Sequence, residues 1–300
     1  ALDQGTTLNE YGLVELASDK VLACKTEEEI YKALGMPWIA PPMREDTGEV
    51  EAAIEGALPE LLRGEDICGD LHVHTSYSGD AKSSVEEMVQ SAQELGYQYV
   101  AITDHGYDLR INGVDTESHG KIAEEIKGLR PRYPELLILH GCELNIGKGG
   151  ELDYDEEQRS RFDICLASVH SHFDLPVAEQ TKRLIRAMED PSVRILGHML
   201  GRSIGKREGI EVDVDAVLSA ALANKVAIEV NSGLNRLDAP ADILKRACEL
   251  GNDFVVNSDA HHKDHLSGVR FGILHSHRGW VPREKVINAW PRDRFEEWLK

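Results

Sequence analysis

The chain has 300 residues, of which 41% are hydrophobic, and its formal net charge is −20 at pH 7. This charge speaks against a nucleic-acid binder with a generally basic surface, although a local basic patch or bound cations could reverse the field in one cleft. No apolar run approaches the ~20 residues of a membrane helix, and the five scattered cysteines show no C-x-x-C pair, so we expect a cytoplasmic protein without a disulfide framework or a cysteine zinc finger.

Residues 1–66 are predicted to form a small segment of their own. Residues 5–14 read as a hairpin, and a helix is predicted over residues 26–34 because Thr26 is a good N-terminal cap. The proline-rich stretch 36–43 that follows is expected to be extended or turned. The segment is too small and too polar to have much of a core.

Residues 67–300 alternate short apolar runs with amphipathic helices, such as the one predicted over residues 84–95. Several runs are almost wholly apolar, as in parallel strands that are buried on both faces. This alternation predicts an α/β fold, either a barrel or a doubly wound sheet. The seven predicted strands span residues 70–74, 98–103, 136–143, 164–170, 193–198, 226–231 and 254–259.

Metal-binding side chains stand at the ends of six of these seven strands. In a barrel of parallel strands the carboxyl ends share one rim, where active sites lie. A doubly wound sheet would instead spread them along a line, so the pattern favours a closed or nearly closed barrel. The side chains are His72 with His74, His105, Glu143, His170, His198, and Asp259 with His261.

The chemistry of these side chains predicts a cluster of metal ions. Alternate residues of a strand point the same way, so His72 and His74 can bind one ion together, as can Asp259 and His261. Imidazole and carboxylate suit Zn²⁺, Mn²⁺ or Fe²⁺. The set exceeds the ligands of a single catalytic zinc, so we expect two or three ions bridged by Glu143 and Asp259.

The other histidines are given plainer roles. His172 stands two residues after His170 and is a candidate for contact with substrate. His140 lies within a predicted strand and is expected to be structural. The remaining ones expected to be solvated are His119, His262, His265 and His277.

Several motifs resemble those of the PHP (polymerase and histidinol phosphatase) superfamily. Within it, the chain is most similar to the C-terminal part of bacterial and archaeal family X DNA polymerases. The stretch GRSIGKREG supports this, and residues 8–13 and 27–39 resemble the end of that polymerase's thumb. The PHP-like motifs are DLHVHTSYSGD (70–80), AITDHG (101–106), GCELNI (141–146), ASVHS (167–171), LGHMLGRSIGKREG (196–209) and NSDAH (257–261).

The resemblance implies a distorted (β/α)₇ TIM-like barrel over residues 67–300, preceded by a partial thumb-like segment and linker over residues 1–66. It also implies three divalent ions, Mn²⁺ first and Zn²⁺ or Fe²⁺ as alternatives. Asp80 is the ninth candidate ligand, one position later than the family pattern. The full set of metal ligands implied is His72, His74, Asp80, His105, Glu143, His170, His198, Asp259 and His261, with catalytic roles for His72, His74, His105, Glu143 and Asp259.

The activity implied is hydrolysis at DNA 3′ ends by a metal-activated hydroxide, as a 3′→5′ exonuclease, with 3′-phosphatase and abasic-site cleavage left open. We expect no polymerase activity, because no palm carboxylates are present; a full-length protein could carry polymerase domains as partners. A small-molecule phosphatase of the histidinol-phosphatase type and a non-catalytic PHP scaffold are the alternatives. The candidates for phosphate contact are Arg202, Lys206, Arg207, Arg278 and His172.

Overall fold

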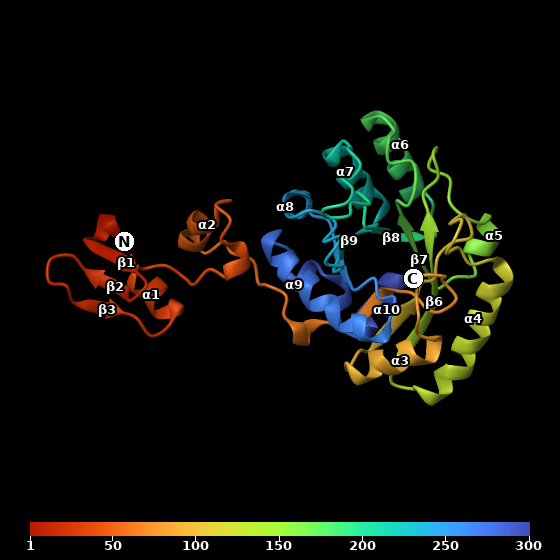
Figure 1. Cartoon of the computed structure of the whole chain (residues 1–300), viewed down its shortest axis with the longest axis horizontal. Coiled ribbons are helices and arrows are strands. Elements are labelled where there is room, and N and C mark those ends of the chain that lie inside the picture. Colours follow the sequence, from red (N-terminus) through yellow and green to blue (C-terminus); the bar gives the residue numbers. More distant parts are fainter. The chain divides into compact units, whose positions relative to one another are not determined.

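The computed structural model describes residues 1–300, which form two compact units, residues 1–59 and 60–300 (Figure 1). None of the helices is both long and apolar enough to cross a membrane. The two units are described separately below.

The first unit contains a three-stranded antiparallel sheet and two short helices. The predicted hairpin is present as the first two strands, and the third strand, a three-residue run, was not predicted. The hydroxyl group of Thr26 accepts a hydrogen bond from the backbone of Glu29, which confirms the predicted cap. The elements are β1 (Thr6–Asn9), β2 (Gly12–Glu15), β3 (Val21–Ala23), α1 (Glu27–Ala33) and α2 (Glu49–Glu55).

The second unit is built on a seven-stranded parallel sheet in which neighbours in the chain are neighbours in space, in the order β10-β9-β8-β7-β6-β5-β4. All seven predicted strands are present, although several end one or two residues earlier than expected. The strands are β4 (Gly69–Val73), β5 (Tyr99–Ile102), β6 (Leu137–Asn145), β7 (Ile164–Ser168), β8 (Val193–Gly197), β9 (Ala227–Asn231) and β10 (Phe254–Asn257).

Helices surround this sheet on its outer side (Figure 1). The helix predicted over residues 84–95 begins after Ser84, whose side chain and that of Glu87 cap each other's backbone groups. The helices are α3 (Val85–Glu94), α4 (Thr116–Leu129), α5 (Glu156–Arg159), α6 (Val177–Met188), α7 (Val214–Asn224), α8 (Ala241–Leu250), α9 (Val269–Arg278) and α10 (Arg292–Leu299).

The sheet curves until its first and last strands meet, which confirms the nearly closed barrel. A single parallel bridge joins Val73 to Ala260. Side chains complete the seam: the Asp70 carboxylate accepts a hydrogen bond from the backbone of Ser258 at 3.0 Å. Farther along, the Asn288 amide donates to the carbonyl groups of Gly69 (2.9 Å) and Val256 (2.7 Å).

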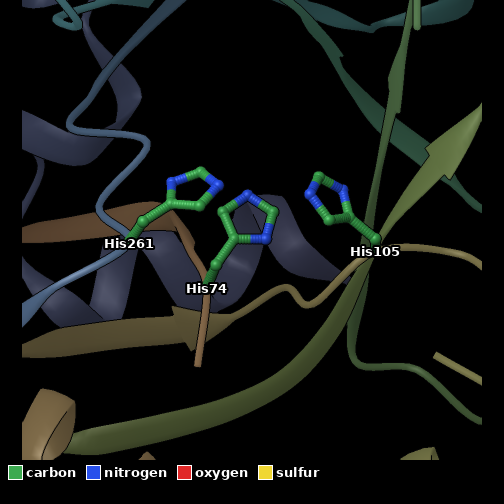
Figure 2. A group of neighbouring side chains, drawn as sticks. All are labelled: His74, His105 and His261. Carbon is green, nitrogen blue, oxygen red and sulfur yellow. The ribbon is translucent and has the colours of Figure 1, made fainter. Parts of the chain in front are cut away.

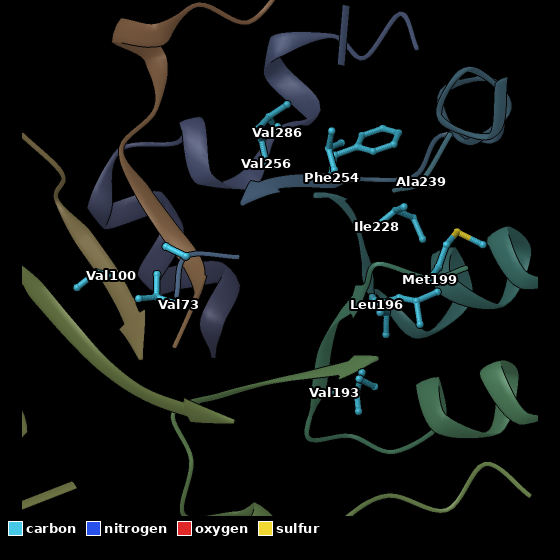
Figure 3. Packing of buried hydrophobic residues seen from close by; sticks show 14 of the residues in the cluster. Val73, Val100, Val193, Leu196, Met199, Ile228, Ala239, Phe254, Val256 and Val286 are labelled. Carbon is cyan, nitrogen blue, oxygen red and sulfur yellow. The ribbon is translucent and has the colours of Figure 1, made fainter. Parts of the chain in front are cut away.

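Alternation along the strands divides the core into two layers. Ile228 and Val230 of β9 belong to the cluster that includes residues of the surrounding helices. Figure 3 shows Ile228 within this cluster. Ala227 belongs instead to a cluster to which all seven strands contribute, so this cluster fills the barrel interior. The same alternation turns Glu229 inward, between Ile228 and Val230. A carboxylate is thereby placed inside the barrel by an otherwise apolar strand.

Candidate metal centre

The structure brings the eight strand-end side chains together at the carboxyl rim of the barrel. His74 follows β4, His105 follows β5 and His261 follows β10; Figure 2 shows His74 lying between the other two rings. The ring centroid of His74 is 4.3 Å from those of both His105 and His261. Four groups of three donor atoms converge: His74–His105–His261, His72–His74–Asp259, His72–Glu143–His198 and His105–Glu143–His170.

Glu143 is the carboxylate common to most of the cluster. Its Oε1 lies 2.8 Å from Nε2 of His198 and 3.2 Å from Nε2 of His170, and its Oε2 lies 2.8 Å from Nδ1 of His105. Donor atoms held ~2.1 Å from one tetrahedral ion are separated by about 3.4 Å. The 3.2 Å spacing approaches that value and the two 2.8 Å spacings are shorter, so these atoms converge as the ligands of a metal ion do.

Asp259 occupies the corresponding place at the last strand. Its Oδ1 lies 3.3 Å from Nε2 of His74 and 3.6 Å from Nε2 of His72. Glu143 and Asp259 therefore flank the same pair of histidines from two sides. This is the arrangement expected of the two bridging carboxylates.

Eight nitrogen and oxygen atoms of the cluster are buried and lack a hydrogen-bond partner. Buried polar atoms are almost always hydrogen-bonded, so a set of unsatisfied ones around one point needs another partner. Divalent cations fit this set, because all its members are imidazole nitrogens or carboxylate oxygens. The atoms are Nε2 of His72, both ring nitrogens of His74, Nδ1 of His105, both oxygens of Glu143, Nε2 of His170 and Nδ1 of His198.

The surrounding charges shift the pKa values of His72 and His74 in opposite directions. Burial opposes the charge of His72, but the carboxylates of Glu229, Glu143 and Asp259 raise its pKa well above the ordinary value. Burial and the nearby His105 and His261 lower the pKa of His74 well below its ordinary value. Although burial works against it, the surrounding histidines hold the pKa of Glu143 well below its usual range. The carboxylate of Glu143 is therefore ionised.

Glu229 is a member of the site that the sequence analysis missed. It lies in β9, is fully buried, and accepts a hydrogen bond from Nδ1 of His72 at 2.7 Å. This leaves Nε2 of His72 free to face the cluster, as in other metal sites where a carboxylate orients a histidine. Glu229 also accepts from the backbone of His198 at 2.7 Å and from the amide of Asn257 at 2.9 Å. The available signal was a charged residue within an apolar run.

Asn145 plays a similar part for another histidine. Its side-chain oxygen lies 2.6 Å from Nδ1 of His170, so Nε2 of that ring faces Glu143. Because Asn145 lies within β6, as does Glu143, one strand supplies both a donor atom and the group that orients another.

Asp80 lies at the edge of the cluster. Its Oδ2 is 3.5 Å from Nε2 of His261 and 3.7 Å from Nε2 of His105, and it accepts a hydrogen bond from the amide of Asn112 at 2.7 Å. Its side chain is 38% exposed, in contrast to the buried donors. Although Asp80 stands one position later than in the family pattern, its carboxylate lies next to two of the histidines.

The candidate phosphate-contacting cations are placed differently from one another. The guanidinium of Arg202 donates to the carbonyl groups of Arg236 and Leu237, and that of Arg207 donates to Gly201. Lys206, His172 and Arg278 are exposed, the last of them in α9. The two arginines bind backbone carbonyl groups of loops, and the other three side chains are exposed to solvent. None of the five residues lines the cleft described below.

Arg236 is the cation beside the cluster, and the sequence analysis did not single it out. Its Nε lies 3.3 Å from Oδ2 of Asp259, and its side chain is 22% exposed. Together with Asp80, Asp259 and His261 it lines an open cleft of about 640 Å³. The local sequence does not indicate that Arg236 lies at the cluster, because Arg236 stands five positions beyond the end of β9.

The expectation that His119 is solvated is wrong. His119 lies in α4, fully buried, with Nε2 3.2 Å from the carbonyl oxygen of His105 and Nδ1 3.4 Å from Nε2 of His140. Burial lowers the pKa of His119 to about 4 and that of His140 to about 3. The neutral pair supports the backbone of His105 from behind.

Comparison with known proteins was made for sequence and for structure. Residues 70–233 match the family model described as PHP domain, and residues 1–45 match the one described as DNA polymerase beta thumb. The chain belongs to the PHP domain family. This PHP chain is 36% identical over 301 residues to the "DNA polymerase/3′-5′ exonuclease PolX" of Bacillus subtilis, covering all of this chain and 52% of that protein. The chain thus spans about half the length of that relative.

Two further relatives agree with the family assignment. A "probable phosphatase" of Caldicellulosiruptor bescii is 31% identical over 205 residues, which cover 65% of this PHP chain and 80% of that protein. The histidinol phosphate phosphatase of Lactococcus lactis, solved with zinc, L-histidinol and phosphate, superposes with a TM-score of 0.51 at 18% identity, covering 68% of this chain and 92% of that one. The PHP domain of this chain is a metal-dependent phosphoesterase with a TIM-like barrel fold.

Proposed function

We propose that the chain hydrolyses phosphoester bonds at the 3′ ends of DNA, chiefly as a 3′→5′ exonuclease. The observation that carries this proposal is that a thumb-like segment and a near-complete set of candidate metal donors occur in one chain. The relative that matches the whole of this chain is named as a 3′-5′ exonuclease. A phosphatase for small metabolites does not need a polymerase-like thumb. DNA is therefore the substrate class that accounts for both the thumb-like segment and the PHP domain.

The divalent ions would be held by the converging donors and by Asp80. Bound ions would supply positive charge for phosphate oxygens and lower the pKa of a coordinated water. We propose three ions, with Mn²⁺ preferred and Zn²⁺ or Fe²⁺ as alternatives, since nitrogen and oxygen donors accept all of them. The proposed ligands are His72, His74, Asp80, His105, Glu143, His170, His198, Asp259 and His261.

The reaction forms one bond from a water oxygen to phosphorus. It breaks the bond between phosphorus and the 3′ oxygen of the preceding nucleotide, which leaves with a proton from the water. Glu143 and Asp259 are the carboxylates among the proposed donors beside His72 and His74. Glu229 keeps His72 oriented through the 2.7 Å hydrogen bond. Such positioning and charge neutralisation supply most of the catalysis of phosphoryl transfer.

Arg236 is the side chain that would bind a phosphate oxygen. Its guanidinium stands beside Asp259 at the mouth of the cluster, and guanidinium groups bind phosphates through two parallel hydrogen bonds. Lys82 lies nearby, in a second hollow that it lines with Asp80 and His261. These two cations give the local positive charge that the net charge of −20 conceals.

A small-molecule phosphatase is the second candidate. The relative from C. bescii is named as a phosphatase, and the acidic surface suits a small substrate better than a long polyanion. A PHP scaffold without catalysis is the third candidate. A scaffold would be expected to have lost metal ligands, so the near-complete donor set speaks against it.

The test compares substrates on the Mn²⁺-loaded protein. We expect stepwise loss of nucleotides from labelled 3′-recessed and single-stranded DNA, and no loss with the variant His72→Ala/His74→Ala. Release of phosphate from histidinol phosphate with DNA left intact would replace the proposal by the small-molecule phosphatase. Turnover of neither substrate by metal-loaded protein would favour the scaffold.

A further inference from the structure

We propose that the cleft beside the metal centre binds the 3′-terminal nucleoside of a DNA strand and so selects nucleotide substrates. This inference rests on the proposed function and names the part of the substrate that is recognised. The cleft has a volume of about 640 Å³, within the ~300–1,000 Å³ of typical small-molecule sites. It lies entirely within the second unit.

The position of the cleft ties it to the chemistry. Asp80, Asp259 and His261 form one end of it, so a phosphate at the metal centre would direct its substituent into the cleft. The two other walls are residues 232–236, which follow β9, and residues 264–271, which lead into α9. Arg236 belongs to the first of these wall segments, and its Nε lies 3.3 Å from Oδ2 of Asp259. The reacting phosphate and its sugar therefore have adjoining places.

The walls offer apolar surface of the kind that a base requires. Phe271 lies in the cleft wall, with the guanidinium of Arg270 4.7 Å from its ring centre. Leu234 lies in the other wall segment and is 60% exposed. Bases stack on aromatic and guanidinium faces with little dependence on sequence. An exposed leucine beside such a face suits a planar ligand that would cover it.

Polar groups on the cleft suit the sugar and the edges of the base. Asn235 and Asp264 are exposed on opposite wall segments. An amide group can both donate and accept hydrogen bonds, and a carboxylate accepts them, so these two side chains suit the sugar hydroxyl group and the base edges.

The wall formed by residues 232–236 is held rigid before any ligand binds. The backbone of Gly233 donates to the side chain of Asn231 at 3.0 Å, and that of Arg236 donates to Gly233 at 2.7 Å. Arg202 clamps the far end by donating to the carbonyl of Arg236 at 2.8 Å, and Ile204 donates to Asn235 at 2.7 Å. A preformed wall reduces the entropic cost of binding. Arg202 is therefore a positioning residue for this cleft.

The occupant we infer is a nucleoside and not the small amine of histidinol phosphate. The apolar surfaces of Leu234 and Phe271 would remain uncovered beside an amine of that size. A base and its sugar cover both.

The test uses two chromogenic diesters that share a leaving group. Thymidine 5′-(p-nitrophenyl phosphate) carries a nucleoside, and bis(p-nitrophenyl) phosphate does not. Both release p-nitrophenol when water attacks phosphorus. The variants are Phe271→Ala and Leu234→Ser, and Leu274→Ser is the matched control because Leu274 is 49% exposed in the same helix as Phe271 but does not line the cleft.

We expect Phe271→Ala to raise KM for the thymidine substrate by about 10-fold, as for loss of one stacked base, and Leu234→Ser by about 3-fold. Neither change should alter kcat/KM for the other diester by more than about twofold, and Leu274→Ser should leave both substrates unaffected. Equal effects on the two diesters, or none on either, would overturn the cleft assignment. Failure of the unaltered protein to cleave either diester would instead overturn the proposed function.

Discussion

Two groups of buried histidines lie close to His105, and they differ in the groups that surround their rings. In the metal centre, the rings face the carboxylates of Glu143 and Asp259, and several of their nitrogens lack hydrogen bonds. In the second group, the rings of His119 and His140 pack edge-on against Phe162. Their nitrogens are bonded to each other and to the carbonyl of His105.

The comparison shows that neighbouring groups, and not burial, decide what a histidine does. His72 and His119 are both fully buried, yet carboxylates raise the pKa of His72 whereas burial among apolar rings lowers that of His119. A charged or metal-binding imidazole needs acidic neighbours. A neutral one needs only a donor and an acceptor, and then serves as packing.

The largest effect should come from removing the shared carboxylate of the metal centre. We expect Glu143→Gln to lower phosphodiesterase activity by at least about 1,000-fold, because charge neutralisation supplies most of the catalysis, and to lower the bound metal content. Activity on a chromogenic diester and elemental analysis measure the two effects. Glu156→Gln, an exposed change at the start of α5, is the matched control. A fully active Glu143→Gln protein would contradict the proposed centre.

A smaller effect is expected from Glu229, which contacts the cluster by its hydrogen bond to His72 and is not one of the proposed metal ligands. Glu229→Gln should weaken metal affinity by about 10–100-fold, and activity with it at limiting metal, as for other groups that orient a metal-binding histidine. The loss should recover in part when the Mn²⁺ concentration is raised. A loss of activity with metal affinity unchanged would show that Glu229 does not act through His72.

The second histidine group is expected to matter for stability more than for catalysis. His119→Leu leaves the carbonyl of His105 without its hydrogen bond, which costs about 1–3 kcal/mol in a buried setting. Chemical denaturation measures this, and His119→Gln, which keeps a donor, should recover part of it. If His119→Leu abolished metal binding without affecting stability, the two groups would not be distinct.

The pH dependence of stability sharpens the same contrast. The folded-state pKa of His119 is about 4, below the ordinary value of 6.5, so between these values the unfolded chain binds more protons. The associated stability is present above pH 6.5 and is lost as the pH falls towards 4. We therefore expect the stability of the unaltered protein to fall more steeply than that of His119→Gln between pH 6.5 and 4.5. Parallel curves would mean that His119 is not held neutral.

The smallest effect is expected from Lys206. This exposed residue lies in the loop after β8 and does not line the cleft at the metal centre. Lys206→Ala should therefore change kcat/KM on DNA by less than about twofold, since isolated surface charges contribute little. A larger loss, removed by added salt, would place Lys206 on the path of the DNA strand.

The barrel and its strand-end donors were predictable because both follow from patterns within short stretches of sequence. Apolar runs set the strands, and the candidate donors stand at or just beyond the carboxyl ends of these runs, on the shared rim. Glu229 was missed because its role depends on His72, which lies 157 positions away. His119 was misjudged because polar residues flank it in α4, and only packing against β6 shows that it is buried.

The cations illustrate a further limit. Arg202 follows His198 in the sequence, but its guanidinium is directed to the backbone of Arg236 and Leu237. Arg236 reaches Asp259 only because that clamp shapes its loop. The conformation of an irregular loop is set by contacts between distant segments, so its side-chain directions do not follow from local sequence.

The seam of the barrel has a consequence for the synthesis of the chain. His72 and His74 follow one side of it and Asp259 and His261 the other, and Asn288 joins the two edges. A nascent chain that has not yet released residue 288 from the ribosome lacks this clasp. The donors for the metal ions would therefore assemble late in translation, after almost the whole barrel has been synthesised.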